Sequence, residues 1–573
     1  MHEGTCDALF KIKQEINMKD NSLVPEDLAL QVQDLYRLSG EDITNRILEA
    51  ANPAKIVQSF SEQDFFWLMK KAGEEEYLPL LKLASTEQRQ YILDMELWTR
   101  DQIKGDVTFE WLERMRKADP DHLAWWLFNQ GQDLAHLILF QNIDVVVRAP
   151  DEDLNLPEEF FTLDNVLYIR VINYKHYDTI RKIIELLFRE NENYARNLIE
   201  EVASIIPAEM EEDMYRQRTT RLSEAGFLPF DEASSVFSPL DPKILETGET
   251  LPRRFTQKDE EIQSSVPVLP LLNAGVETIF ARTLSDIGDE SLIDRARLEF
   301  AGLCNRITAA EGLGDLDPDI LREKCRNAGG YINIALEKVC GINVGHAAEL
   351  IQKNSLESLF RVGFGYAVRL KWKAESWVER SWFSSLGLDT AFWGTSWGMA
   401  LKGLMKEKPL FYTGLPEEEY RGFEKLLEID TAEEILDRVV VLDDFLRHLH
   451  ETYDYERSLY EEKDLEFYPL ILSFWARLIL TLEPDLSGIS FEEATTFFET
   501  LRAEEDKPPY TMAGFYERFQ ADLLQNAPPL EGKHLDLFEE TLSLIWQKFQ
   551  EEFESVPTET LDARYSRFLL VRD

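Results

Sequence analysis

Apolar residues recur at helical spacing along most of the chain, and this pattern limits the fold more than any other feature of the sequence. Two segments, Ser61-Glu-Gln-Asp64 and Ser85-Thr-Glu-Gln88, begin with a hydroxyl residue followed three positions later by a side chain that can reach back. This arrangement indicates a helix N-terminus. The two signals lie 24 residues apart, about the length of one helix–turn–helix unit. The sequence therefore predicts an N-terminal array of helix pairs.

The pattern changes between Asn142 and Asn173. Asp144-Val-Val-Val-Arg148 and Val166-Leu-Tyr-Ile-Arg-Val-Ile172 are short and rich in β-branched and aromatic residues, and an acidic loop containing proline separates them. Such segments favour strands, so we expect a two-stranded hairpin or a small sheet here. The predicted fold class is mainly α: a multi-domain helical array of helix pairs with a small β-hairpin insertion.

The chain has 573 residues, more than a single hydrophobic core of about 250–300 residues can organise. Residues 239–268 contain four prolines, mixed charge and few apolar residues, which is typical of a linker. We therefore predict an N-terminal helical-pair array over residues 1–142, a small β insertion with flanking helices over 143–238, this linker, and a C-terminal helical domain over 269–573.

The charge of the chain excludes several classes of partner. The sequence has 61 Lys and Arg against 107 Asp and Glu, a net charge of −46. Such a polyanion is repelled by phosphate, so we expect no nucleic-acid partner and no docking on anionic membranes. Hydrophobic residues make up 44% of the chain, which is enough to fold it. The most apolar window, Tyr468–Leu482, is interrupted by Arg477 and is shorter than the roughly 20 residues a bilayer requires, so it predicts a buried helix.

The cysteines and glycines give no sign of a cofactor. Cys6, Cys304, Cys325 and Cys340 form no CxxC pair, so we expect reduced thiols, as in the cytoplasm, and no thiolate metal site. The N-terminus has no apolar run of the kind found in secretory signals. No glycine-rich segment extends to a dinucleotide- or phosphate-binding motif. We therefore predict a cytoplasmic protein with no small-molecule cofactor.

Two motifs could carry chemistry. Gly394-Thr-Ser-Trp-Gly398 matches the pattern GxSxG, but no β-branched run precedes it, so we interpret it as a glycine-rich loop that opens a helix. Asp444, His448, Glu451 and Tyr455 fall on one side of a predicted helix, which would suit a metal or acid–base site. The apolar residues of that helix fall on the opposite side, so we favour a solvated face.

Basic residues gather in one segment, 361–382, against the overall acidity. Arg361, Arg369 and Lys373 fall on one side of a predicted helix, and Trp377 is among the tryptophans interleaved with them. This face could bind an acidic partner through aromatic anchors. Alternatively, it pairs within the chain with residues 411–470, where 18 acidic and 6 basic residues leave a net charge of −12. We favour intramolecular pairing.

Several segments resemble one family in the same order along the chain. They include Phe109-Glu-Trp-Leu-Glu113, Ser238-Pro-Leu-Asp-Pro242, Gly330-Tyr-Ile-Asn-Ile-Ala-Leu-Glu337 and Ser355-Leu-Glu-Ser-Leu-Phe-Arg-Val-Gly-Phe364. The resemblance is to an uncharacterised bacterial family catalogued as domain of unknown function 6178, and it covers about residues 50 to 560. It implies no activity, cofactor or catalytic residue.

These observations predict a non-enzymatic cytoplasmic scaffold or regulatory adaptor that binds another protein through helical surfaces. The alternative is an enzyme or metal-binding protein whose site is assembled from dispersed Asp, Glu and His residues.

Overall fold

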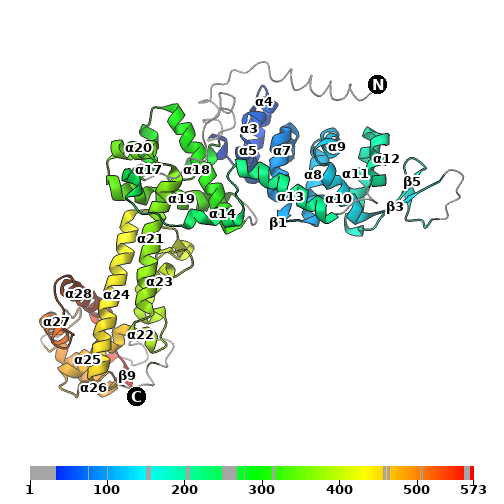
Figure 1. Ribbon diagram of the computed structural model, residues 1–573. Helices are drawn as coiled ribbons and strands as arrows, with labels where there is room; N and C mark the ends of the chain where they lie inside the picture. Colours follow the sequence, from blue (N-terminus) through cyan, green and yellow to red (C-terminus); the bar gives the residue numbers. More distant parts are fainter. Residues whose placement is uncertain are drawn as a thin grey trace. The chain divides into compact units, whose positions relative to one another are not determined.

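The computed structural model is mainly α, as predicted (Figure 1). It describes residues 34–572, with the exception of 75, 100, 150–155, 202–206, 248–266, 276–277, 313–316, 456–459, 461–464, 504, 506 and 561–567. Most of the predicted linker lies outside the described residues. The chain divides into two compact units, unit 1 comprising Met1–Ile332 with Cys340–Arg361, and unit 2 comprising Asn333–Val339 with Val362–Asp573.

Unit 1 begins with a row of short helices (Figure 1). The Oγ of Ser61 accepts a hydrogen bond of 3.0 Å from the backbone N–H of Asp64, and Ser85 and Gln88 form a reciprocal capping box. Both predicted helix starts are therefore confirmed. The helices are α3 (Gly40–Leu48), α4 (Pro53–Ser59), α5 (Glu62–Ala72), α6 (Leu78–Leu83), α7 (Thr86–Glu96), α8 (Gly105–Ala118), α9 (Pro120–Asn129) and α10 (Gln132–Asn142), with the short pair β1 (Trp98–Thr99) and β2 (Gln102–Ile103) between α7 and α8.

The predicted small sheet is also present. It consists of β3 (Ile143–Val147), β4 (Phe161–Thr162) and β5 (Leu167–Val171), all antiparallel, in the spatial order β3-β5-β4. Alternate residues of the central strand β5, beginning with Leu167, are fully buried, and the residues between them are half-buried. This alternation is the reason the segment folds as a strand with one face on the core.

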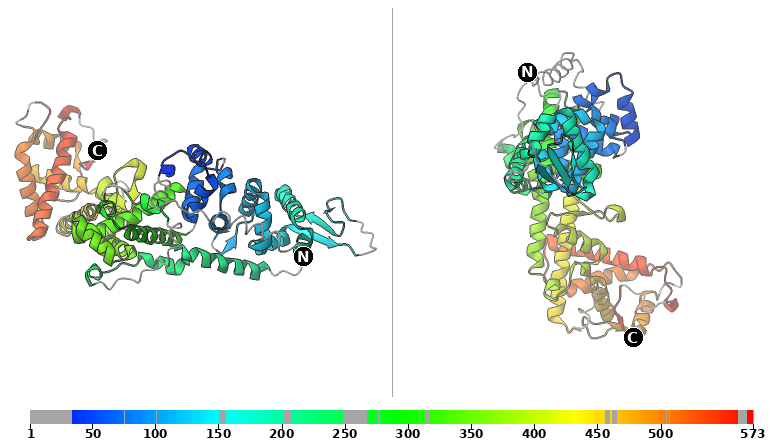
Figure 2. Two further views of the ribbon diagram at one scale, coloured as in Figure 1. Left: turned by 90° about the horizontal axis from the view of Figure 1, so that it is seen from above. Right: turned by 90° about the vertical axis from the view of Figure 1, so that its right-hand side faces the viewer.

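A long helix, α13 (Pro207–Glu224), crosses the row and contacts α7 and α10 (Figure 2). Gly226 follows it with φ of +92°, and a Cβ at this position would lie 2.9 Å from the Cα of Gly302, so the turn requires glycine. The other helices of unit 1 are α11 (Tyr177–Glu190), α12 (Glu192–Glu201), α14 (Phe230–Ser234), α15 (Ile244–Thr247), α16 (Leu269–Leu272), α17 (Ile279–Asp286), α18 (Glu290–Glu311) and α20 (Val344–Lys353), while α19 (Pro318–Cys340) contributes to both units.

In unit 2, α21 (Leu356–Val378, whose first turns belong to unit 1) and α24 (Leu426–Thr452) run side by side (Figure 1 and Figure 2). The apolar window predicted to be a buried helix is α25 (Phe467–Ile479), and the ring of its Trp475 is fully buried. The remaining elements are α22 (Trp382–Ser385), α23 (Gly394–Leu404), β6 (Phe411–Tyr412), β7 (Tyr420–Arg421), β8 (Ile489–Ser490), α26 (Phe491–Leu501), α27 (Tyr516–Gln525), α28 (Lys533–Phe553) and β9 (Val571–Arg572). Within the described ranges, no helix has both the length and the apolar character needed to cross a bilayer.

Candidate functional site

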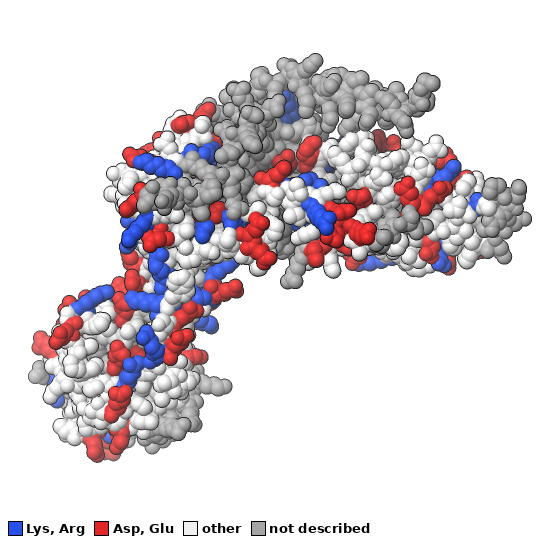
Figure 3. Space-filling model, viewed as in Figure 1, with Lys and Arg blue, Asp and Glu red and all other residues white. Residues whose placement is uncertain are grey.

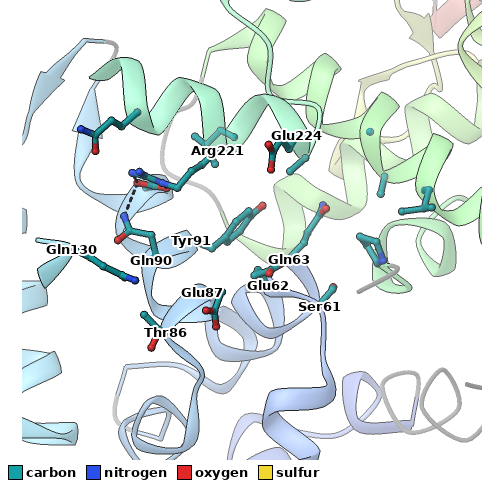
Figure 4. A pocket seen from close by; sticks show the side chains of 18 of the residues that line it. Ser61, Glu62, Gln63, Thr86, Glu87, Gln90, Tyr91, Gln130, Arg221 and Glu224 are labelled. Carbon is teal, nitrogen blue, oxygen red and sulfur yellow. Dashed lines mark hydrogen bonds and ion pairs between the residues drawn. The ribbon is translucent and has the colours of Figure 1, made fainter. Parts of the chain in front are cut away.

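Unit 1 contains a polar pocket of about 990 Å³. This volume lies at the upper end of the range of about 300–1,000 Å³ typical of small-ligand sites. Its walls come from α5, α7, the turn between α9 and α10, and α13, while Leu298, Ala301 and Gly302 of α18 add small and apolar surface. Figure 4 shows side chains from these walls directed toward one space. The pocket is therefore assembled from segments far apart in the sequence.

Carboxamide side chains are the most frequent polar groups of the wall. A carboxamide carries both a donor and an acceptor. Three of these amides are held by other residues. Gln63 exchanges two hydrogen bonds with Asn305, of 2.9 and 3.1 Å, and Gln90 donates to Asp94 at 3.0 Å and accepts from the indole of Trp126 at 3.1 Å. The third, Asn129, donates to the carbonyl of Trp125 at 2.7 Å. The amides are Gln63, Gln90, Asn129, Gln130, Gln132 and Gln217.

Three of the amides remain available to a ligand. The side chains of Gln130, Gln132 and Gln217 make no hydrogen bond to any residue in the described part of the chain. Gln130 and Gln217 are exposed, and Gln132 is half-buried. Figure 4 shows Gln130 pointing from its turn toward the pocket.

The pocket carries a negative charge. Five carboxylates and one guanidinium line it, which gives −4. The guanidinium of Arg221 is committed to Asp94, with Nε–Oδ2 and Nη2–Oδ1 distances of 2.7 and 2.8 Å, and this bidentate pair joins α13 to α7. The other four carboxylates have no ion pair with a described residue; they belong to Glu62, Glu87, Asp133 and Glu224.

Tyr91 adds a phenol to this charged wall. Its ring extends from α7 toward α13, and the carboxylate of Glu224 on α13 points toward the ring (Figure 4). Burial raises the pKa of Tyr91, and the neighbouring carboxylates of Glu62, Asp64 and Asp94 raise it further. The phenol therefore stays protonated at neutral pH and can donate a hydrogen bond to a ligand.

Asp64 holds the backbone at one edge of the pocket through hydrogen bonds. Its buried carboxylate accepts hydrogen bonds from the backbone N–H groups of Val268 and Leu269, at 2.8 and 2.9 Å, and thereby holds the segment that follows the pocket residue Pro267. Burial raises the pKa of Asp64 to about 6, although the two backbone hydrogen bonds act in the opposite direction. The carboxylate thus caps the first turn of α16, although burying its negative charge costs free energy.

The four residues that sequence analysis proposed as a binding face lie outside this pocket. Lys373 donates to Glu433 at 3.0 Å and to Asp437 at 2.6 Å, both on α24 within the acidic segment. Burial opposes the charge of Lys373, but these carboxylates prevail and its pKa is raised. Figure 3 shows Lys and Arg interspersed with Asp and Glu on the visible face of unit 2. The contacts of Lys373 are those expected from intramolecular pairing.

The other three members of the proposed face also contact protein groups. In unit 1, the Nε of Arg361 donates to the carbonyl of Ser238 at 2.8 Å. In unit 2, the guanidinium of Arg369 lies 4.5 Å from the ring centre of Tyr366. Trp377 is only 9% exposed and stacks on Phe383, with ring centres 5.3 Å apart. None of these side chains lines the pocket of unit 1.

Two motifs noted in the sequence can be located in the structure. Helix α23 begins at Gly394, so the GxSxG segment is the opening turn of a helix. Among the described residues, no three His, Cys, Asp or Glu side chains lie close enough to hold a metal ion, including those around His448. Cys304 and Cys325 are buried and Cys340 is half-buried, and all three are free thiols. Cys6 lies outside the described residues.

Sequence reasoning missed the pocket, although one signal was present. Asn129, Gln130 and Gln132 place three carboxamides within four positions, between two helices whose remaining residues are largely apolar. Most of the other wall residues lie in segments that were interpreted only as helix starts or helix interiors, and Pro267 lies in the predicted linker. Their meeting depends on the tertiary arrangement of α5, α7 and α13.

The fold and the pocket together define an acidic, mainly α-helical protein built on an array of short helices with a polar pocket in that array. The chain belongs to a family of unknown function, DUF6178, whose family model matches residues 21–572. This confirms the family resemblance found in the sequence. No curated protein and no solved structure matches the chain.

Proposed function

We propose that the protein is a non-enzymatic cytoplasmic scaffold or regulatory adaptor, and that the pocket of unit 1 binds an extended, basic segment of a partner protein. The observation that carries the proposal is the composition of the pocket, in which available carboxamides stand beside carboxylates that have no ion pair among the described residues.

The carboxamides suit an extended chain. An extended segment presents an N–H and a C=O at nearly every residue, and each needs a partner when it leaves water. Helices use their own backbone groups internally, so a helical wall can satisfy such a segment only through side chains. Gln130, Gln132 and Gln217 each offer a donor and an acceptor at the same pocket.

The charge of the wall selects a basic segment. Glu62, Glu87, Asp133 and Glu224 attract Lys and Arg side chains, and a carboxylate can accept a guanidinium with two hydrogen bonds. The protonated phenol of Tyr91 adds a donor for a backbone carbonyl, and its ring offers a face for a cation. An acidic segment would meet like charges on several sides.

The proposal is tested by selecting a library of randomised peptides on the full chain. The double variant Glu62→Gln/Glu224→Gln keeps the shape of the wall and removes two charges. We expect the selected peptides to be enriched in Lys and Arg, to bind the double variant at least tenfold more weakly, and to bind less well as salt is added, since the attraction is screened. Binding is measured by fluorescence anisotropy.

A matched control is Glu499→Gln, which removes an exposed carboxylate of α26 in unit 2 and should leave the affinity unchanged. Selected peptides that are acidic or purely apolar, or that bind the double variant as tightly as the parent chain, would contradict the proposal. A second variant, Gln130→Ala/Gln217→Ala, separates the contribution of the amides, because it leaves the charge intact.

A further inference from the structure

The outer edge of strand β3 presents unpaired backbone groups. β3 is an edge strand because the sheet has the order β3-β5-β4. Two hydrogen bonds lie at the ends of its pairing with β5. The N–H of Arg148 donates to the carbonyl of Val166 at 2.8 Å, and the N–H of Ile172 donates to the carbonyl of Asn142 at 2.9 Å. In an antiparallel ladder such bonded pairs alternate along the strand. The even-numbered residues of β3 therefore bond to β5, and the odd-numbered residues direct their backbone groups outward.

Five outward groups have no hydrogen bond to the rest of the described chain. They are the N–H and C=O of both Val145 and Val147, and the C=O of Ile143. The N–H of Ile143 is occupied, because it donates to Leu139 at the end of α10. Val145 is half-buried and Val147 is 52% exposed, so solvent reaches this part of the strand.

β3 also lacks the features that usually protect an edge strand. It has no lysine, no proline and no bulge, and three of its five residues are consecutive valines. Its single charge, Asp144, is paired with Arg170 across the sheet, where the Nε–Oδ2 distance is 3.1 Å. The edge is therefore β-branched and locally neutral, although the chain as a whole is strongly acidic.

We propose that β3 pairs with β3 of a second copy of this chain, antiparallel, about a two-fold axis that passes through Val145. In this register Val145 faces its own counterpart, and Ile143 faces Val147. The N–H of Val145 donates to the carbonyl of the other Val145, and the N–H of Val147 donates to the carbonyl of Ile143. The two copies thus form four backbone hydrogen bonds and one continuous sheet of six strands.

The free groups of this edge are self-complementary about Val145, which suits a second copy. Each copy offers two donors and three acceptors, and the register about Val145 gives both donors an acceptor on the other copy. The N–H of Ile143, which is already used, lies opposite the C=O of Val147, so that carbonyl is left to solvent and no donor faces a donor. Asp144 lies opposite Val146, so like charges do not meet directly. This pairing involves none of the pocket residues and is independent of the proposed function.

The test is the oligomeric state of the full chain, measured by sedimentation velocity over concentrations up to about 100 µM, the range of a weak dimer. In about 0.15 M salt, where charges are screened beyond about 8 Å, we expect the mass to rise from monomer towards dimer with concentration. At low salt the net charge of −46 should weaken the association.

Charged substitutions of Val145, the residue at the proposed two-fold axis, test the register of the strand pairing. Val145→Lys and Val145→Glu should each be monomeric, because like charges would meet at the axis, while an equimolar mixture of the two should form a heterodimer. Val145→Pro should also be monomeric with the sheet preserved in circular dichroism, since the proline removes only an outward N–H. Phe230→Lys, at an exposed site of α14, should dimerise like the parent chain.

A parent chain that stays monomeric at every concentration overturns the proposal. So does a dimer that survives both charge variants, or a mixture of the two that fails to associate.

Discussion

The capping carboxylate of Asp64 should make the stability of unit 1 depend on pH. The side chain is 1% exposed, and burial raises its pKa from 3.8 to about 6. Since one pKa unit corresponds to about 1.4 kcal/mol, raising the pKa from 3.8 to about 6 changes the free energy of unfolding by about 3 kcal/mol. A raised pKa means that the folded state holds the proton more tightly. Protonated Asp64 therefore adds stability to the folded state. This contribution is complete below a pH of about 4 and is lost as the pH rises through about 6.

The perturbation is Asp64→Asn, which keeps the shape and removes the titration. A chain with two compact units need not unfold in one step, so a local measurement is required. Hydrogen exchange of the segment containing Val268 and Leu269, corrected for intrinsic rates, gives the free energy of opening. In the parent chain this free energy should fall by up to about 3 kcal/mol between pH 4 and pH 7. In Asp64→Asn the part of this pH dependence that comes from residue 64 should be absent.

Asp443 provides a matched control in unit 2. Its fully buried carboxylate accepts from the N–H groups of Trp382 and Phe383, at 2.9 and 3.0 Å, and burial raises its pKa. Asp443→Asn should alter exchange at Trp382 and Phe383 and leave the segment held by Asp64 unchanged. Parent and Asp64→Asn chains with the same pH slope would refute the reasoning.

Three further predictions concern stability, each with a measurement by thermal or urea unfolding. Gly226→Ala should destabilise by about 1–3 kcal/mol more than Gly312→Ala, since both glycines have φ near +90° but only Gly226 has neighbours within 4 Å of a Cβ; equal losses would contradict this. Trp475→Ala should cost about 3–5 kcal/mol, because the ring is fully buried, whereas Trp372→Ala, at a site 53% exposed, should change stability by less than about 0.5 kcal/mol. Lys373→Gln should cost about 0.2–1 kcal/mol at low salt and less at high salt, because the side chain is 44% exposed; a loss independent of salt would argue against its ion pairs.

Local signals predicted the secondary structure well. The caps at Ser61 and Ser85 depend on residues three positions away, and strands β3 and β5 on short runs rich in β-branched and aromatic residues. Each could therefore be recognised within a short window. The buried helix α25 was recognisable for the same reason, since its composition alone requires burial.

The pocket could not be predicted in this way, because its geometry depends on contacts between distant residues. Gln63 meets Asn305 across 242 positions, and Asp94 meets Arg221 across 127. No periodicity encodes such pairs.

Lys371 shows the same limit on a single helix. A helical wheel places it within the apolar stripe of α21, where a charge is unexpected. In the structure its Nζ donates to the carbonyls of Lys406 and Glu407, at 2.7 and 2.9 Å, just beyond the end of α23. The wheel cannot show these acceptors, because they belong to the segment that follows another helix.

The bonds that hold Gln63 and Gln90 have a consequence for the thermodynamics of recognition. Both amides are already engaged by the protein, so these two parts of the pocket wall keep one orientation before any partner arrives. An immobilised side chain loses about 0.5–1.5 kcal/mol of conformational freedom on binding, and these two have already lost it during folding. An incoming segment would therefore lose mainly its own freedom, and stiffening that segment, for example by cyclisation, should raise its affinity more than any change to these two amides.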